Sequence, residues 1–374
     1  MLRRSFLGIA VLVLASGTLL RAQDEVFIKG KSIKGKITKE SPREITVGVK
    51  DVVQAVDILD IKYSPDPLTA RLAYNAAYNV EKESLDPAKE TTRKSLIADA
   101  IKKYEDVLPT IQTNFAKRHI EYKIAMLRVR QVQEDGEDPA KAIKSLTNFA
   151  RTKANKSGWQ INSALQTLGR LQVDASDFDG AIATYQQIAD LALLPEDVRQ
   201  DARLSGIQVK LQGGKYDEAR SELKDLQKEL QQGSRFFARA KVAEAECLVA
   251  ETAKYKDRPK DDPARAKLFS DAVELVRGVI KSSNDKYVKA VGHNTLGYCY
   301  MEQGQTKDAV WEFLWVDVVY NQDRAQHAKA LYYLWELFSK DGDAPRAQEC
   351  REALLGTQFT GLEYQRKVKD AKTP

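Results

Sequence analysis

The sequence predicts a mainly α-helical protein, an α-solenoid of about seven helical hairpins with a small β-barrel at its N-terminus. Two observations support this prediction. From Leu68 to Val368, apolar residues recur every three or four positions, as they do along amphipathic helices. Within that region one short alanine-centred pattern returns seven times, and repetition at a nearly constant spacing indicates stacked hairpins. The composition agrees, because 43% hydrophobic and 30% charged residues over 374 positions allow a buried core.

The first 22 residues have the pattern of a secretory signal peptide. Arg3 and Arg4 precede an apolar stretch from Phe6 to Leu20, and the small residue Ala22 follows it. A basic start, a short apolar segment and a small residue are typical of export signals. We therefore expect an exported protein of the bacterial periplasm or cell envelope, with secretion as an alternative. Membrane contact is expected only if this segment stays uncleaved as an anchor.

Residues 24–64 predict a small β domain. Apolar residues alternate with polar ones at period two, as at Ile45, Val47 and Val49, and Gly30-Lys31 supplies a turn. Four or five short strands in so short a segment are best satisfied by a closed or nearly closed barrel, which leaves no exposed edges. The segment resembles small SH3-like or Sm-like barrels. Two prolines in Tyr63–Pro67 then predict a linker.

The helical region, residues 68–368, repeats an alanine followed by an apolar or aromatic residue four positions later. Five of the six steps between successive alanines are 37 to 42 residues long, and the alanines are Ala100, Ala142, Ala181, Ala219, Ala272, Ala309 and Ala347. A Leu-Gly pair precedes two of them by twelve or thirteen positions, at Leu168-Gly169 and Leu296-Gly297. Residues 369–374 predict a frayed tail.

These repeats resemble the tetratricopeptide repeat (TPR) family, most closely in residues 164–195 and 292–320. The resemblance implies hairpins in which the leucine and glycine allow the two helices to approach, the alanine marks the contact, and an aromatic residue fills the space between repeats. It also implies that the first helices of successive hairpins line a concave face, the usual groove for a peptide or protein.

The resemblance places several polar and aromatic side chains on that concave face. They are Gln166, Arg170, Asn294, Tyr298, Tyr332 and Glu336, which suit hydrogen bonding and amphipathic contact with a peptide. A second candidate surface is Trp311 with Trp315, one helical turn apart in an aromatic-rich stretch. We expect these tryptophans either to pack against the last hairpin or to form a docking patch for a partner.

The sequence carries no motif of a known catalytic or metal site. His119, His293 and His327 are far apart, and no GxSxG, GxGxxG or GxxxxGK[ST] pattern occurs. Three widely spaced cysteines, Cys247, Cys299 and Cys350, suit neither a disulfide framework nor a CxxC motif. We therefore expect no enzyme activity, no cofactor and no metal.

The sequence thus predicts a non-catalytic scaffold of the cell envelope that binds a protein or peptide through its concave face. The alternatives are an accessory or assembly factor for an envelope enzyme complex, and nucleic-acid binding through the β domain. The last rests on a group of basic residues, Lys29, Lys31, Lys34, Lys36 and Lys39. Without residues 1–22 the chain would hold 56 Lys and Arg against 53 Asp and Glu, so no nucleic-acid partner is expected from overall charge.

Cleavage of the export signal is directly testable. N-terminal sequencing of the mature protein from its native host should begin near Gln23, because Ala22 ends the predicted signal segment. Mature protein that retains Met1 would contradict this prediction.

Overall fold

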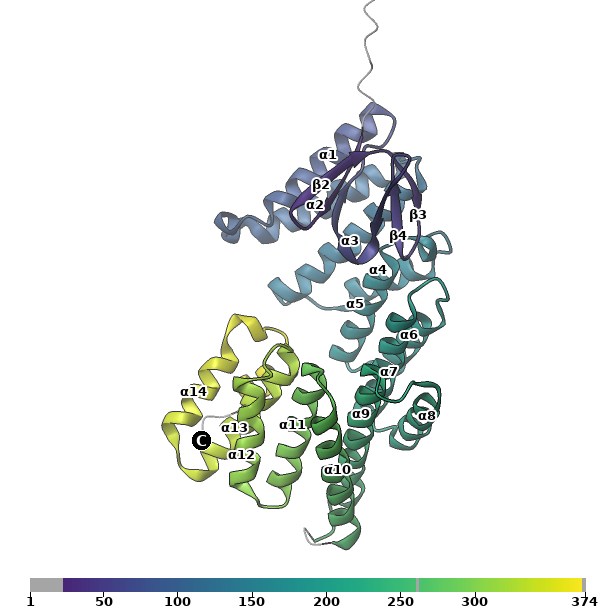
Figure 1. Cartoon of the computed structure of the whole chain (residues 1–374). Coiled ribbons are helices and arrows are strands. Elements are labelled where there is room, and N and C mark those ends of the chain that lie inside the picture. Colours follow the sequence, from purple (N-terminus) through teal and green to yellow (C-terminus); the bar gives the residue numbers. More distant parts are fainter. Residues whose placement is uncertain (1–22, 260–261, 372–374) are drawn as a thin grey trace, which may run out of the picture.

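The computed structural model describes residues 23–259 and 262–371, and in this part of the chain it contains two small sheets followed by fifteen α-helices (Figure 1). The predicted signal peptide and residues 372–374 of the predicted tail lie outside the described residues. Within them, none of the helices combines the length and the apolarity required to cross a membrane.

Fourteen of the helices form seven antiparallel hairpins, which confirms the predicted mainly α solenoid. Their bounds are α1 (Leu68–Glu83) and α2 (Arg93–Val107), α3 (Asn114–Asp135) and α4 (Ala140–Arg151), α5 (Ile161–Asp174) and α6 (Phe178–Asp190), α7 (Glu196–Gln212) and α8 (Tyr216–Glu229), α9 (Arg235–Glu251) and α10 (Pro263–Ser282), α11 (Lys286–Glu302) and α12 (Thr306–Val318), and α13 (Arg324–Asp341) and α14 (Ala344–Leu355). The last helix, α15 (Glu363–Asp370), has no partner helix of its own and extends two residues beyond the predicted end of the solenoid.

Small residues set the close approach of the two helices in each hairpin. All seven repeat alanines lie on the second helices and are buried, six of them completely. A Cβ atom on Gly297 of α11 would lie 2.8 Å from the Phe313 ring of α12, and one on Gly169 of α5 would lie 3.0 Å from the Tyr185 ring of α6. Since real Cβ atoms do not approach so closely, the glycines are needed for this contact, and the predicted repeat register is confirmed.

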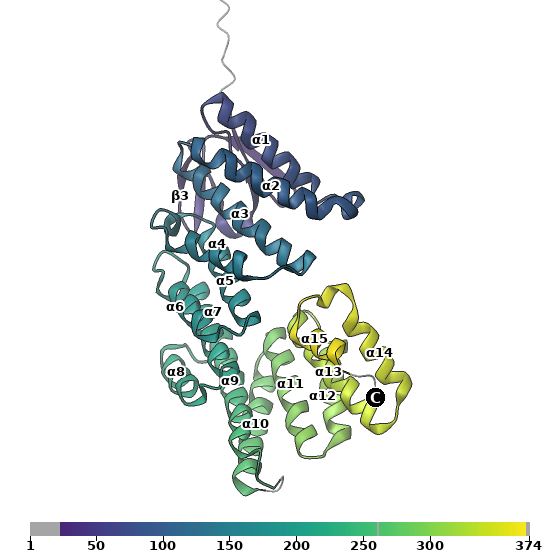
Figure 2. The same cartoon turned by 180° about the vertical axis from the view of Figure 1, so that it is seen from behind.

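The stack of hairpins curves back on itself. It runs from α1 to α10 and then turns, so that α11 to α15 fold back toward α5 (Figures 1 and 2). One hydrophobic cluster joins residues 245 to 371, and others join residues 125 to 202 and 204 to 247. The core is therefore a chain of local clusters, as expected for hairpins that contact mainly their neighbours.

The β segment does not form the predicted closed barrel. Strands β1 (Asp24–Ile28), β2 (Lys31–Gly35) and β6 (Ile58–Lys62) make one antiparallel sheet, in the order β2-β1-β6, and β3 (Ile37–Glu40), β4 (Glu44–Val47) and β5 (Asp51–Gln54) make the other, in the order β3-β4-β5. Closure is not needed to bury the apolar faces of the strands, because Val26, Ile45 and Ile61 share a hydrophobic cluster with α1, α2 and α3.

A buried network of charged groups fixes the first sheet to the helices. The Lys123 ammonium on α3 lies 2.8 Å from Asp60 of β6 and 2.7 Å from Glu81 of α1. Burial alone would raise the pKa of Asp60, but the attraction of Lys123, reinforced by Lys82, holds it well below its usual value. Because Asp60, Glu81 and Lys123 are almost inaccessible to solvent, each of these charges requires its partners, and the network holds β6 in a defined position.

Further contacts make the β segment a cap on the first three hairpins. Arg118 of α3 pairs with Glu40 of β3, whose carboxylate also accepts from the Tyr63 hydroxyl. The Arg43 guanidinium donates to the carbonyls of Leu193 and Leu194, in the loop before α7, at 2.7 and 3.1 Å. Tyr63, in the predicted linker, is itself buried, so the connection to α1 is packed against the core.

Enlarging a repeat alanine should destabilise the solenoid. We expect Ala181→Leu and Ala309→Leu each to cost about 1–3 kcal/mol in urea unfolding, because both alanines are fully buried where two helices meet. The matched control is Ala353→Leu on the exposed face of α14, which should change stability by less than about 0.5 kcal/mol. Unchanged unfolding of both core variants would show that the hairpins do not pack in this register.

Candidate functional site

A groove of about 1470 Å³ lies on the inner side of the curved stack. Five first helices, α5, α7, α9, α11 and α13, supply most of its lining, as the repeat pattern predicts. The end of α3 and residues 360–366, which lead into α15, contribute further lining. We call this surface the concave groove.

Charged side chains of both signs line the concave groove in equal number. The basic ones are Arg170, Lys256, Arg265, Arg324, Lys329 and Arg366, and the acidic ones are Glu134, Asp174, Glu246, Glu302, Asp323 and Glu363. Arg265 and Glu302 pair between α10 and α11. This groove therefore presents balanced charge, unlike a surface built to hold a polyanion.

One ion pair in the groove has a long separation between its charged groups. Glu246 of α9 and Lys329 of α13 approach to 3.9 Å, each with about a fifth of its side chain exposed. Burial raises the pKa of Glu246 above its ordinary value, and the nearby Lys329 ammonium offsets part of that rise. Both side chains can therefore gain from a polar group that enters between them.

Tyrosines supply most of the aromatic surface of the groove. Tyr298 of α11 and Tyr333 of α13 meet edge to face with ring centroids 5.6 Å apart, and Tyr364 of α15 lies 6.0 Å from Tyr333. Tyr216 and Tyr287 line the same groove. Tyrosine combines a rigid apolar ring with a hydrogen-bonding hydroxyl, so this surface suits amphipathic contacts.

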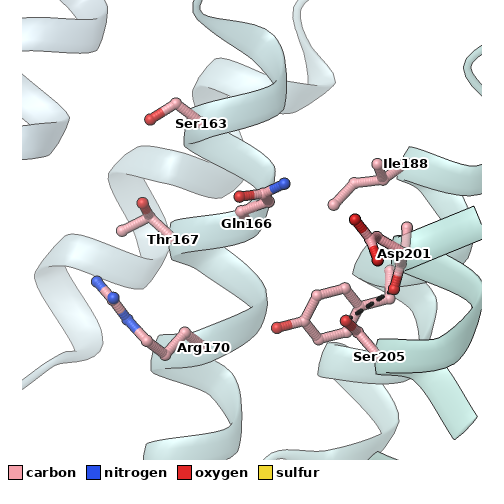
Figure 3. Close-up of a pocket in the computed structure, with 9 residues that line it drawn as sticks. Ser163, Gln166, Thr167, Arg170, Ile188, Asp201 and Ser205 are labelled. Carbon is pink, nitrogen blue, oxygen red and sulfur yellow. Dashed lines mark hydrogen bonds between the residues drawn. The ribbon is translucent and has the colours of Figure 1, made fainter. Parts of the chain in front are cut away.

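A smaller cavity of about 340 Å³, the α5–α7 pocket, adjoins the concave groove through their shared residue Arg170. Gln166 of α5 points toward Asp201 of α7, while the Arg170 side chain extends to the other side of α5 (Figure 3). Ser163, Thr167 and Ser205 add hydroxyl groups to the lining. Polar side chains thus continue the groove toward the N-terminal hairpins.

The structure places three of the predicted concave-face residues on these surfaces. Gln166 and Arg170 are exposed and line the α5–α7 pocket, and Tyr298 lines the concave groove. Tyr332 and Glu336 are hydrogen-bonded to each other at 3.0 Å and lie outside the groove lining, with Tyr332 against the Tyr364 ring.

The expectation that Asn294 is partly exposed is wrong. Its side chain is fully buried, and its amide nitrogen donates to both the backbone carbonyl and the side-chain oxygen of Gln326, at 2.9 Å each. These bonds join α11 to α13, so Asn294 holds two adjacent first helices together. The repeat pattern alone does not distinguish such a contact from a groove position.

The two tryptophans on α12 lie on its outer surface. Trp311 is 67% and Trp315 47% exposed, with Val318 and Val319 exposed on the next turn. Trp315 stacks on His293 and on Tyr320, with centroids 5.8 and 6.2 Å away. In the described structure neither tryptophan belongs to a buried cluster with the last hairpin, so the packing interpretation does not hold for them.

Sequence reasoning missed Glu246, Lys329, Tyr333 and Tyr364. Lys329 and Tyr333 are one helical turn apart on α13, so they lie on the same side of that helix. The sequence would have predicted both residues if the side of α13 that faces the groove had been known. Tyr364 belongs to α15, outside the repeats, and no repeat position predicts it.

The remaining predictions from the sequence concern metal ligands, the basic residues of the β segment and the cysteines. No group of three or more His, Cys, Asp or Glu side chains that could hold a metal ion occurs among residues 23–259 and 262–371. The five lysines between positions 29 and 39 of the β segment are all exposed, and Lys34 pairs with Glu25 at 3.7 Å. All three cysteines are buried and unbridged, and burial raises the pKa of each thiol to about 12.

Comparisons with known proteins agree with the repeat assignment at the level of the fold. No protein-family model matches the chain, and no curated protein does. Among solved structures, the chain is similar to a tetratricopeptide repeat protein from Parabacteroides merdae, with a TM-score of 0.50 and 12% identity over 79% of this chain and 97% of that one. A Rap protein complexed with competence and sporulation factor gives a TM-score of 0.43 and 13% identity over 81% and 79%. The first of these two likenesses, together with the packing of the repeats, shows that the fold is a TPR-type α-solenoid.

Removing the buried Asn294 amide should destabilise the protein. We expect Asn294→Ala to cost about 1–3 kcal/mol in urea unfolding, because the fully buried Asn294 amide makes two hydrogen bonds to Gln326 that the variant loses. Gln166→Ala, on an exposed position of the α5–α7 pocket, is the control and should change stability by less than about 0.5 kcal/mol. Equal effects of the two substitutions would contradict the assignment of Asn294 to the interface between α11 and α13.

Proposed function

We propose that this protein is a non-catalytic scaffold that binds a polypeptide segment in its concave groove. The observation that carries the proposal is the lining of that groove, which combines size, balanced charge and tyrosine surface. A volume of about 1470 Å³ exceeds the roughly 300–1,000 Å³ typical of small-molecule sites. A segment of several residues fills such a space better than a metabolite does.

The charges of the groove support a polypeptide partner. Six basic and six acidic side chains distributed over its walls offer partners for both signs of charge. Protein segments carry both signs together with backbone amides and carbonyls, whereas nucleic acids present an unbroken row of phosphates. Glu246 and Lys329, 3.9 Å apart in the lining, can accept and donate hydrogen bonds to such a segment.

The tyrosines support the same class of partner. Tyr298, Tyr333 and Tyr364 come from three different helices and present rings to one space. Tyrosine adds contact area with little loss of side-chain entropy, which is why it is enriched at protein-binding surfaces. An extended or helical segment that carries apolar and polar side chains in alternation suits this lining.

The proposed location is the bacterial cell envelope. It rests on the signal-like sequence of residues 1–22 and on the expectation that an exported scaffold acts there. In this setting the protein would hold a component of an envelope complex, which includes the role of an assembly or accessory factor.

Exposed groove residues should be required for partner binding and dispensable for folding. We expect the triple variant Gln166→Ala, Arg170→Ala and Gln212→Ala to weaken binding of a partner captured from the native envelope by more than about 1 kcal/mol, with an unchanged thermal midpoint. Affinity is measured by calorimetry with the purified partner.

The matched control carries three equally conservative changes on second helices, Gln186→Ala, Lys224→Ala and Gln348→Ala, all at exposed positions outside the groove lining. It should bind the partner as the wild type does. If the control weakens binding and the groove variant does not, the partner binds the outer surface, and the proposal is wrong.

A further inference from the structure

The curved solenoid has an N-terminal arm, α1 to α6, and a C-terminal arm, α9 to α15. The two arms meet at the opening of the concave groove without a shared hydrophobic core. In the described residues, the clusters that contain α5 end at residue 202, and the cluster that contains α15 begins at residue 245. An ion pair nevertheless links the two arms, since the Arg366 guanidinium on α15 lies 3.7 Å from the Asp174 carboxylate on α5. This contact joins positions far apart in the sequence.

The charges on the two helices are complementary. Arg170 and Asp174 are one turn apart at the end of α5, and Glu363 and Arg366 are nearly one turn apart on α15. All four side chains line the concave groove. Burial raises the pKa of Asp174, and its ionised form is favoured by Arg366 and by Arg170 and disfavoured by Glu363, so these four groups act on one another.

We propose that the Arg366–Asp174 pair is an electrostatic latch that holds the mouth of the concave groove closed when no ligand is bound. The latch is suited to opening, because both side chains are 40% or more exposed and water can replace each partner. An exposed ion pair biases an equilibrium by up to about fivefold, enough to favour the closed arrangement without locking it.

The hinge of this motion lies between the arms. Hairpin α7–α8 connects them, and its hydrophobic cluster, residues 204 to 247, is separate from the cluster that ends at residue 202 and from the one that begins at residue 245. Small changes in packing at successive hairpins add up along such a stack and change the distance between its ends. The N-terminal arm moves as a unit because the β segment fixes its first three hairpins through Arg118 and Arg43.

The latch does not depend on the identity of a ligand, but its role as a gate for polypeptide entry rests on the proposed function. A segment that enters the groove between α5 and α15 meets this ion pair. Its own charged groups can replace either partner of the latch, so ligand binding and opening are coupled.

Electron–electron distance measurements on the ligand-free full chain test the latch. Spin labels at Lys144→Cys on α4 and Glu352→Cys on α14 report the separation of the arms from exposed positions, since the three native cysteines are buried. We expect Arg366→Glu, which faces Asp174 and Glu363 with a like charge, to shift the distance distribution to longer values. Salt near 1 M should shift the distances of the otherwise unchanged protein in the same direction. The Debye length is then about 3 Å, so the attraction between Arg366 and Asp174 is screened.

Two further variants make the result specific. The charge exchange Asp174→Arg with Arg366→Glu should restore the shorter distances, and Lys369→Glu, an equal charge change at an exposed position of α15, should leave them unchanged. Unaltered distances in Arg366→Glu, or no recovery in the exchanged variant, would overturn the latch. Because no ligand is present, either result is independent of whether a polypeptide partner is found.

Discussion

Every hairpin of this protein depends on two helices approaching closely at one small residue. The seven buried alanines mark these contacts on the second helices, and Gly169 and Gly297 make room for the rings of Tyr185 and Phe313. This packing sets the tilt between successive hairpins and thus the curvature of the stack. The concave groove is a consequence of that curvature, because the first helices supply most of its inner lining. Its side chains can therefore vary without loss of the fold.

Much of the fold could be predicted from the sequence, because each repeat carries its own local signals. Alanine spacing predicted seven hairpins and their register, and the alternation of apolar residues predicted the strands. Barrel closure could not be predicted in this way. The strands cover their apolar faces with α1 to α3 instead. The buried partners of Lys123, which are Asp60 on β6 and Glu81 on α1, are more than 40 residues away from it along the chain.

The candidate site was predictable only in part, and the reason is geometric. A repeat pattern predicts which helix faces inward but does not separate positions that contact the next helix from positions that face solvent. Asn294 and Tyr298 differ by one turn on α11, yet the first is buried against Gln326 and the second lines the groove. Tyr364 and Arg366 line the groove from α15, which lies outside the repeats. The curvature of the whole stack brings α15 close to α5, and the repeat pattern does not predict that contact.

Site-specific photo-crosslinking in cells of the native host tests most directly whether the concave groove holds the partner. A benzophenone side chain placed at Gln212 faces the groove from α7, and one placed at Lys224 faces outward from α8, both at exposed positions. Our account predicts a discrete polypeptide adduct from the position of Gln212 and none from that of Lys224. An adduct formed only from Lys224, or from the exposed Trp311 position on α12, would contradict the assignment of the groove as the binding site.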